Sequence, residues 1–288
     1  MADLSPSAGA RLLIQCPDRP GIVAAVSTFL SGTGANIVSS DQFTTDPENG
    51  EFFMRLTFVW PEGGRARFIF EEGFGEVAER FGMRWRTTWP GDRKRVVLMV
   101  SRMDHCLADL LWRYDHGELE MNIAAVISNH EDSRASVEAL GVPYHHIPVT
   151  RDTKPEAEAT LLTLLEGNCD LIVLARYMQI LSGEFLDTVG CPVINIHHSF
   201  LPAFAGAGPY ERAHARGVKL IGATAHYATV DLDEGPIIAQ GVLEVSHRDS
   251  VEDLIRVGRD VERVTLARAV RSHLEDRVVV HEGRTMLL

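Results

Sequence analysis

The sequence predicts an α/β protein in which a doubly wound, mostly parallel sheet follows a smaller βαββαβ domain. Strand-like and helix-like segments alternate in that order over residues 11–89, whereas short continuous apolar runs separated by helical stretches follow residue 95. Apolar runs without alternation fit strands that are covered on both faces, as in a parallel sheet. The length of 288 residues also favours two domains.

The first part of the chain has the βαββαβ order of a ferredoxin-like domain. Asp18 is expected to cap the first helix, with Pro20 in its first turn and glycines after its end. The turn DPENG joins the second and third strands into a hairpin. The expected strands are 11–16, 35–45, 51–60 and 83–89, and the expected helices are 21–30 and 64–80.

The turn and charged run PGDRKR at 90–95 is the expected domain boundary, which gives domains at 8–90 and 94–288. Strands and helices alternate in the second domain, as in a doubly wound α/β fold. The expected strands are 96–101, 123–128, 171–176 and 192–196, with helices around 104–117, 132–140, 154–166 and 182–189. The tail adds strands at 219–228 and 236–245, a helix at 250–274 and a terminal hairpin.

Composition excludes several classes of partner. The net charge of −12 is opposite to the balance of a protein that neutralises many phosphates, so nucleic acid is not an expected partner. The apolar runs fall short of the ~20 residues of a membrane helix, and the N-terminus lacks the pattern of a secretory signal. The four cysteines are scattered and form no CxxC pair. We therefore expect a cytoplasmic protein with reduced thiols and no membrane partner.

Polar side chains gather at the end of the predicted strand 192–196, in the stretch VINIHHSFLP. Asn195 and His197 are two residues apart, so they share one face of the strand. Ligands bind beyond the carboxyl ends of such strands, and two donors converging on one oxygen can stabilise an oxyanion. A single histidine here would more often satisfy loop carbonyls, but the pair predicts attack on an acyl carbon.

A second cluster lies in GATAHYATVDLDEGPII at 222–238. Thr224 and His226 alternate on a strand, and Asp233 follows in the loop. An acidic loop before Gly-Pro is more often a solvated turn. Asp233 is nevertheless a candidate acid/base partner of His197.

A zinc site built from His197, His198 and Asp233 is the competing hydrolytic interpretation. Adjacent residues at a strand end point to opposite faces, so His197 and His198 would rarely share one ion. HEDSR and HEGRT both lack the second histidine of an HExxH motif. No metal is therefore expected.

The combined motif resembles the folate-dependent formyltransferase family. Asn-x-His, Ser-x-Leu-Pro, Gly-x-Thr-x-His and Leu-Asp-x-Gly-Pro occur in NIHHSFLP, GATAH and LDEGP, and the resemblance covers roughly 94–288. It implies a formyltransferase-like, Rossmann-type fold with Asn195, His197 and Asp233 as catalytic residues. The stretch ARYMQILS resembles the loop of that family that binds the pterin. The resemblance implies folate contacts from Met178, Gln179, Leu181, Thr224 and His226.

The N-terminal stretch CPDRPGIVAAVSTFLSGTGANIVSSDQ resembles an ACT domain, in which an Asp-Arg-Pro-Gly turn precedes the first helix. ACT domains commonly pair, which implies a homo-oligomer, and they often sense small metabolites. An amino acid such as glycine or methionine is a possible effector at the turn before the helix. The alternative to effector binding is a purely structural role, in which this domain holds subunits together.

The fusion of both segments, with NIHHSFLPAF at the strand end, resembles the formyltetrahydrofolate deformylase family. The resemblance implies hydrolysis of 10-formyltetrahydrofolate to formate and tetrahydrofolate, with no cofactor. It also implies a part in balancing one-carbon pools and in supplying formate for purine synthesis.

The alternative is a folate-dependent formyltransferase that acts on an amine such as glycinamide ribonucleotide. A phosphate needs closely approaching backbone N–H groups, which glycine permits. The loop SRMDHCLADLL at 101–111 has no glycine, and Asp104 would repel a phosphate. Water is therefore the expected acceptor. A regulator with an inactive catalytic domain is a further alternative, against which the full set Asn195, His197 and Asp233 argues.

Overall fold

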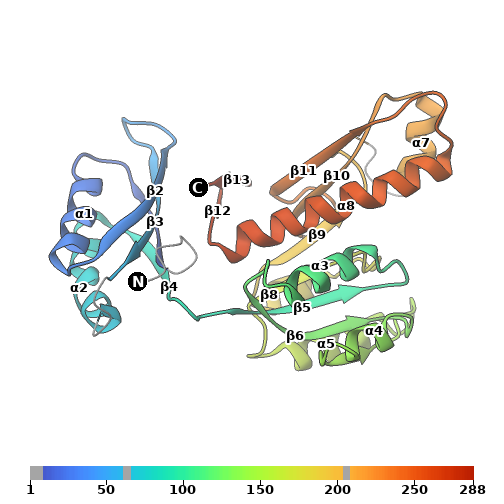
Figure 1. Cartoon of the computed structure of the whole chain (residues 1–288), viewed down its shortest axis with the longest axis horizontal. Coiled ribbons are helices and arrows are strands. Elements are labelled where there is room, and N and C mark those ends of the chain that lie inside the picture. The colour runs from blue at the N-terminus through green and yellow to red at the C-terminus, as the bar shows by residue number, and fades with distance from the viewer. Residues whose placement is uncertain (1–8, 61–65, 204–207) are drawn as a thin grey trace. The chain divides into compact units, whose positions relative to one another are not determined.

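The computed structural model describes residues 9–60, 66–203 and 208–288. The chain divides into two compact units, one ending at Asp92 and one beginning at Arg93 (Figure 1). The sequence places its boundary in the same charged turn, at 90–95. Each unit is described by itself.

In the described part of the N-terminal unit, four strands form one antiparallel sheet in the order β2-β3-β1-β4. This order and the βαββαβ sequence confirm the predicted ferredoxin-like arrangement. The core combines residues of the sheet and of both helices, with Phe58, Phe70 and Phe74 fully buried. The elements are β1 Ala10–Pro17, α1 Ile22–Gly32, β2 Asn36–Thr44, β3 Glu51–Val59, α2 Ala66–Phe81 and β4 Arg84–Thr88.

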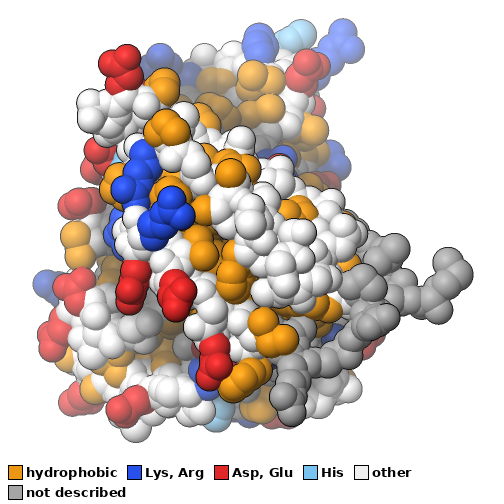
Figure 2. Space-filling model, turned by 90° about the vertical axis from the view of Figure 1, so that its left-hand side faces the viewer, with side chains coloured by type: hydrophobic (Ala, Val, Ile, Leu, Met, Phe, Trp, Pro, Cys, Tyr) orange, Lys and Arg blue, Asp and Glu red, His pale blue; other side chains and the backbone are white. Residues whose placement is uncertain are grey.

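The helix cap predicted at Asp18 is wrong. The N-cap of α1 is Gly21, whose φ of 97° lies in the left-handed region that glycine tolerates. The Asp18 carboxylate instead accepts a hydrogen bond from Thr44 Oγ1 at 2.7 Å, and the Asp18 N–H donates to the carbonyl of Gly50 at 2.8 Å. Asp18 therefore ties the end of β1 to the β2–β3 hairpin. Figure 2 shows the side of this unit that carries α1 and α2, where basic, acidic and apolar side chains are interspersed.

In the described part of the C-terminal unit, seven strands form a mixed sheet in the order β11-β10-β9-β8-β5-β6-β7. Strands β5 to β9 are parallel, β10 pairs antiparallel with β9, and the edge strand β11 pairs antiparallel with β10. The predicted strands are confirmed, and the short β7 is an additional one. The strands are β5 Lys94–Val100, β6 Met121–Ser128, β7 Tyr144–His146, β8 Leu171–Leu174, β9 Val193–His197, β10 Leu220–Tyr227 and β11 Ile237–Glu244.

Helices cover both faces of this sheet, and α8 runs along β9 to β11 (Figure 1). Helices α3 and α8 pack on one face, and α5 and α6 pack on the other. Among the described helices, none is long and apolar enough to cross a membrane. The elements are α3 His105–Asp115, α4 Arg134–Glu138, α5 Lys154–Leu165, α6 Gly183–Thr188, α7 Pro209–Arg216, α8 Val251–Leu274 and the hairpin β12 Val278–His281 with β13 Arg284–Leu287.

The order of the strands creates a topological switch point between β5 and β8. The chain leaves β5 toward α3 on one face of the sheet and leaves β8 toward α6 on the other. The Ser101 N–H, directly after β5, donates to the carbonyl of Arg176 after β8, at 3.2 Å. Ligands bind in open α/β sheets at the carboxyl ends of strands beside such a point.

Candidate active site

Strand β9 presents Asn195 and His197 on one face, as the alternation predicts. Ile194 and Ile196 point to the opposite face, where they join the core beneath α3 and α8. The neighbouring strand β10 runs antiparallel, with His226 opposite Asn195. The amide and two imidazoles therefore lie side by side near the carboxyl end of β9.

The predicted catalytic residues meet in one buried cluster. Nδ1 of His197 lies 3.2 Å from Oδ2 of Asp233, and Nε2 of His226 lies 3.8 Å from Oδ1 of the same carboxylate. Nδ2 of Asn195 lies 3.3 Å from Nε2 of His226. The side chains of His197 and Asp233 are only 7% and 8% exposed, so water screens their interaction weakly.

The loop after β10 carries Asp233 into this cluster. The N–H of Tyr227 donates to the carbonyl of Pro236 at 3.0 Å, which folds the loop back on the strand. A Cβ at Gly235 would collide with the carbonyl oxygen of Tyr227, so this close approach requires glycine. Asp233 itself has a φ of 60°, an uncommon backbone conformation that clusters at functional sites.

His226 fixes the orientation of the Asn195 amide. Its Nδ1 lies 3.0 Å from the carbonyl oxygen of Tyr227, and a carbonyl only accepts, so Nδ1 carries the proton. Burial lowers the pKa of His226, which keeps the ring neutral and Nε2 an acceptor. Asn195 must therefore turn its NH₂ group, not its oxygen, toward His226. The second N–H of that group is available to a substrate oxygen.

His197 is held at one ring nitrogen and available at the other. Its Nδ1 faces Asp233, whereas its buried Nε2 has no hydrogen-bond partner among the described residues. A carboxylate beside Nδ1 orients the ring, as it does in catalytic histidines that act through Nε2. The Nε2 atom is thus the one that can meet a substrate.

Thr224 lies beside the cluster but is fully buried. Its hydroxyl accepts from the N–H of Leu201 at 3.0 Å and donates to the carbonyl of Ser199 at 2.9 Å. Gln240 Nε2 adds a third bond at 3.1 Å. Thr224 therefore holds the turn after β9 and presents no surface to a ligand in this structure.

The predicted folate contacts on the loop after β8 differ in how far their side chains are exposed. Met178 is 60% exposed and has a φ of 58°, so the loop displays its side chain. Gln179 is half-buried, whereas Leu181 packs against the core cluster that includes Tyr177 and Phe185. Met178 and Gln179 are accordingly the better placed to meet a ligand.

Comparison with known proteins places the chain in a family. The formyl transferase family matches residues 94–270, and the ACT domain family matches residues 10–59. The formyltetrahydrofolate deformylase of Mycobacterium bovis is 58% identical over 278 residues, which cover 96% of this chain and 90% of the relative. The chain belongs to the formyltetrahydrofolate deformylase family.

Solved structures agree with this membership of the deformylase family. A formyltetrahydrofolate deformylase from Pseudomonas syringae superposes with a TM-score of 0.91 at 50% identity, over 97% of this chain and 94% of that one. Glycinamide ribonucleotide transformylase 1 from Symbiobacterium toebii gives a TM-score of 0.64 at 31% identity, over 69% of this chain and 95% of that one. The transformylase is therefore a more distant relative than the deformylase.

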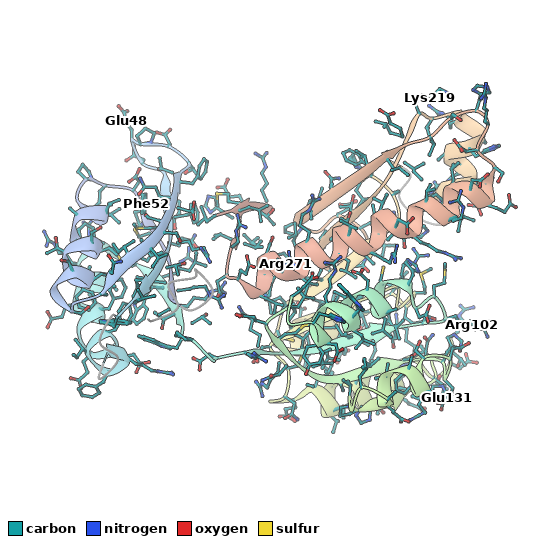
Figure 3. All side chains as sticks on the ribbon, viewed as in Figure 1. Glu48, Phe52, Arg102, Glu131, Lys219 and Arg271 are labelled. Carbon is teal, nitrogen blue, oxygen red and sulfur yellow. The ribbon has the colours of Figure 1, made fainter. Side chains whose placement is uncertain are left out.

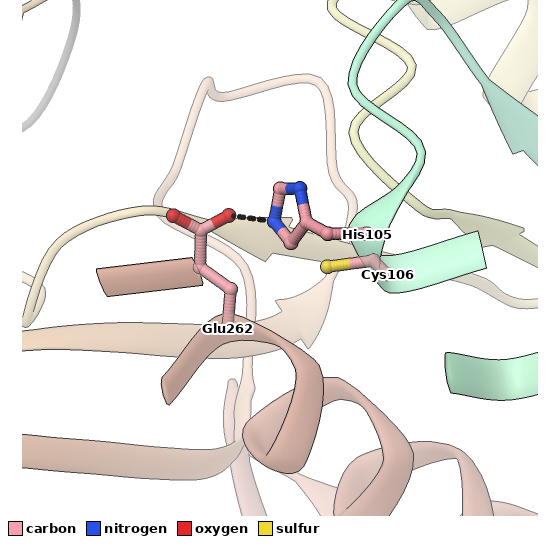
Figure 4. Close-up of side chains that lie close together, drawn as sticks. All are labelled: His105, Cys106 and Glu262. Carbon is pink, nitrogen blue, oxygen red and sulfur yellow. Dashed lines mark hydrogen bonds and ion pairs between the residues drawn. The ribbon is translucent and has the colours of Figure 1, made fainter. Parts of the chain in front are cut away.

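Beside the predicted cluster, this deformylase-family chain holds a buried polar network that the sequence analysis missed (Figure 4). Glu262 on α8 is 1% exposed, and it accepts hydrogen bonds from His105 Nε2 and from the Tyr210 hydroxyl, both at 2.7 Å. Nε of Arg176 lies 3.5 Å from the same carboxylate. The sequence contained one signal, because Arg176 is a charge inside the apolar run LIVLARYMQIL.

The charge of this network disfavours a metal. His105, Cys106 and Glu262 place potential ligand atoms within 4.8 Å of one another. Burial raises the pKa of the Cys106 thiol, which keeps it protonated. Burial alone would raise the pKa of Glu262, but the hydrogen bonds of His105 and Tyr210 and the charge of Arg176 outweigh it and lower that pKa. Glu262 is therefore ionised, and the Arg176 guanidinium already supplies its cation.

His198 lies between the two clusters. Its ring centroid is 5.3 Å from that of His197 and 5.9 Å from that of Tyr210. Burial, reinforced by the charge of Arg176, lowers the pKa of His198 to about 4. His198 is neutral at pH 7 and adds no positive charge to the site.

We expect His198 to make the protein less stable in mild acid. The unfolded chain binds a proton at the ordinary pKa near 6.5 but the folded chain only near 4, so stability is lost as pH falls through this window. Between pH 7 and pH 5 the loss is about 2 kcal/mol. In His198→Gln this loss should be absent. Urea unfolding of both proteins at the two pH values measures it, and an equal pH dependence in both would contradict the expectation.

Proposed function

We propose that this chain hydrolyses 10-formyltetrahydrofolate to formate and tetrahydrofolate. The observation that carries the proposal is the meeting of Asn195, His197 and Asp233 in one buried cluster at the carboxyl end of β9. Membership of the formyltetrahydrofolate deformylase family supports it, and the names of its relatives supply the substrate.

The proposed reaction begins with water. The Asp233 carboxylate takes a proton from a water molecule while the water oxygen bonds to the formyl carbon. The carbonyl oxygen becomes an oxyanion, to which the second N–H of Asn195 and the Nε2–H group of a His197 ring that is protonated at both nitrogens donate hydrogen bonds. The bond from that carbon to the folate nitrogen N10 then breaks, and N10 receives a proton through His197 or through a water held by Asp233. The formic acid that forms passes its remaining proton to solvent water and leaves as the formate anion.

The folate ring is proposed to lie against the loop after β8. The exposed Met178 and the half-buried Gln179 are its proposed contacts, and a thioether packs well on a flat heterocycle. His226 acts through Asn195 in this proposal and is a positioning residue. Thr224 contributes by holding the Ser199–Leu201 turn.

Transfer to an amine is the second candidate function, because a glycinamide ribonucleotide transformylase is among the relatives. The segment after β5 argues against it. Asp104 occupies the N-cap of α3, and its exposed carboxylate would repel the phosphate of such an acceptor. The glycine-free loop also leaves no close backbone cradle for a phosphate.

One assay distinguishes the two functions. Purified protein is incubated with 10-formyltetrahydrofolate, with and without glycinamide ribonucleotide, and formate and tetrahydrofolate are measured. We expect equal rates of formate release in both samples. Formylated glycinamide ribonucleotide as the main product would reject the hydrolase in favour of the transferase.

An amino-acid effector is proposed at the N-terminal unit. A groove of about 690 Å³ lies there beside the start of α1, lined in part by Arg19, Gly21, Thr28 and Arg80. Two guanidinium groups near a helix N-terminus suit a carboxylate. A higher melting temperature in the presence of glycine or methionine would support this effector site. The ACT resemblance also implies a homo-oligomer, and analytical ultracentrifugation of the purified protein would test that proposal. Unchanged melting with both amino acids would reject these effectors.

The reaction as proposed uses water alone and no cofactor. Activity should therefore survive exhaustive chelation, because Asp233 rather than a metal activates the water. A cytoplasmic location and a part in one-carbon balance and purine synthesis stay predictions from the sequence and its family resemblance.

A further inference from the structure

Arg176 is a buried cation at the switch point of the sheet. It follows β8 directly, and its side chain is 7% exposed. Leu174 joins the core under α5 and α6, so an extended backbone would turn Arg176 to that same face. Its φ of 67° departs from the extended conformation, and its side chain lies against Glu262 of α8 instead. The uncommon backbone conformation thus accompanies a charge turned toward the face of the sheet on which α8 packs.

The guanidinium group of Arg176 is poorly satisfied. Its Nε and Nη1 are buried and have no hydrogen-bond acceptor among the described residues. Within the described part of the chain its Nη2 meets only the sulfur of Met103, at 3.6 Å, and a thioether is a weak acceptor. A buried charged donor without an acceptor costs more than a neutral one and requires an explanation.

Glu262 does not supply the missing bonds. The contact from its Oε2 to Nε of Arg176 is 3.5 Å long and lacks hydrogen-bond geometry. Its two oxygens instead accept the 2.7 Å bonds of His105 and Tyr210. Glu262 therefore balances the charge of Arg176 while leaving its donors for another oxygen ligand.

The position of Arg176 relates it to the catalytic cluster. Leu174 pairs with Asn195 in the parallel ladder of β8 and β9, and Arg176 and His197 each follow two residues later. His198 bridges the two sites, because its ring lies 5.3 Å from that of His197 and its proton affinity responds to the charge of Arg176. An anion released at His197 thus forms on the strand next to the one that Arg176 follows, and the Nε and Nη1 donors of that cation have no acceptor among the described residues.

We propose that Arg176 is a binding site for formate, the anion that the reaction releases. Formate has two oxygens in one plane, which match the paired N–H groups of a guanidinium. Its three heavy atoms suit a buried site, whereas the larger carboxylates of a folate tail do not. Met103 covers the guanidinium with a flexible side chain, which can rotate aside to exchange its weak contact for a charged one. The choice of formate as the anion rests on the proposed function.

Binding of formate itself tests the proposal without any turnover. Line broadening of ¹³C-labelled sodium formate is titrated against the full-length protein, at an ionic strength held constant with sodium gluconate. Arg176→Lys keeps the charge but loses the paired donors, so we expect affinity to fall on the order of tenfold or more. Glu262→Gln removes the competing carboxylate, so we expect affinity to rise by about tenfold. If Arg176 and Glu262 formed only a structural ion pair, both substitutions would instead weaken formate binding.

Arg102→Lys is the matched control, because Arg102 is exposed on the neighbouring segment (Figure 3) and its replacement should leave binding unchanged. If Arg176→Lys does not fold, Arg176→Met/Glu262→Gln removes both buried charges together and should abolish binding. Formate affinity that is absent in the wild type, equal in Arg176→Lys, or lowered by Glu262→Gln would overturn the proposal. Arg176-dependent formate binding in a protein without deformylase activity would reject the proposed function alone.

Discussion

Replacing Asp233 by asparagine should reduce formate release by about 10²–10⁴-fold, the contribution of a positioned acid or base. An amide of the same shape cannot take a proton from water. Its neutral oxygen would also be a weaker hydrogen-bond acceptor for Nδ1 of His197, which now lies 3.2 Å from a carboxylate oxygen. The turnover number kcat, measured as formate produced from saturating 10-formyltetrahydrofolate, reports this loss.

Asp231→Asn provides the control for that substitution. Asp231 lies on the same loop, its side chain is exposed, and the change removes the same charge. Its rate should stay within about twofold of the wild type, since surface charges interact weakly. Near-normal formate release from Asp233→Asn would remove this carboxylate from the mechanism.

Truncation of Asn195 to alanine is expected to lower kcat by about 10²–10³-fold, the usual cost of one oxyanion donor. The donor is the N–H of the amide that does not face His226. The substrate binds through its ring as well, so the Michaelis constant should change much less than kcat. Steady-state kinetics on the folded variant separate the two quantities.

Asn122→Ala serves as the comparison for Asn195→Ala. Asn122 is an exposed asparagine on β6, and its loss should leave both kinetic constants near those of the wild type. Circular dichroism must show that Asn195→Ala is folded, because His226 loses its donor there and a buried unpaired group costs about 1–3 kcal/mol. An equal fall in rate for the two variants would mean that the Asn195 amide has no special part in the reaction.

The sequence predicted the strands of both units because their signals are local. Alternating or continuous apolar runs with turn residues at their ends identify strands without knowledge of what packs on them. The elements that were missed have weak local signals. Strand β7 has only the three residues Tyr144–His146 and exists through its pairing with β6. Helix α7 is largely polar and buries Tyr210 and Ala213 against residues from other elements.

The error at Asp18 has a similar physical cause. Aspartate is a common N-cap, but the helix begins at Ile22, four residues after Asp18, and the sequence could not show that Thr44 offers the Asp18 carboxylate a hydrogen bond. Thr224 shows the same limit. Its place in a family motif suggested a ligand contact, but its hydroxyl makes hydrogen bonds to the backbone of Ser199 and Leu201 instead.

The sequence by itself determined the ferredoxin-like unit, the mostly parallel sheet and the choice of Asn195, His197 and Asp233. The first two of these residues share a strand, so a two-residue period aligns them. Only the tertiary structure decided that Arg176, His105, Tyr210 and Glu262 form one buried network. These residues come from four segments, and His105 and Glu262 are 157 positions apart. No local period relates such positions, because the packing of α3 and α8 on one face of the sheet brings them together.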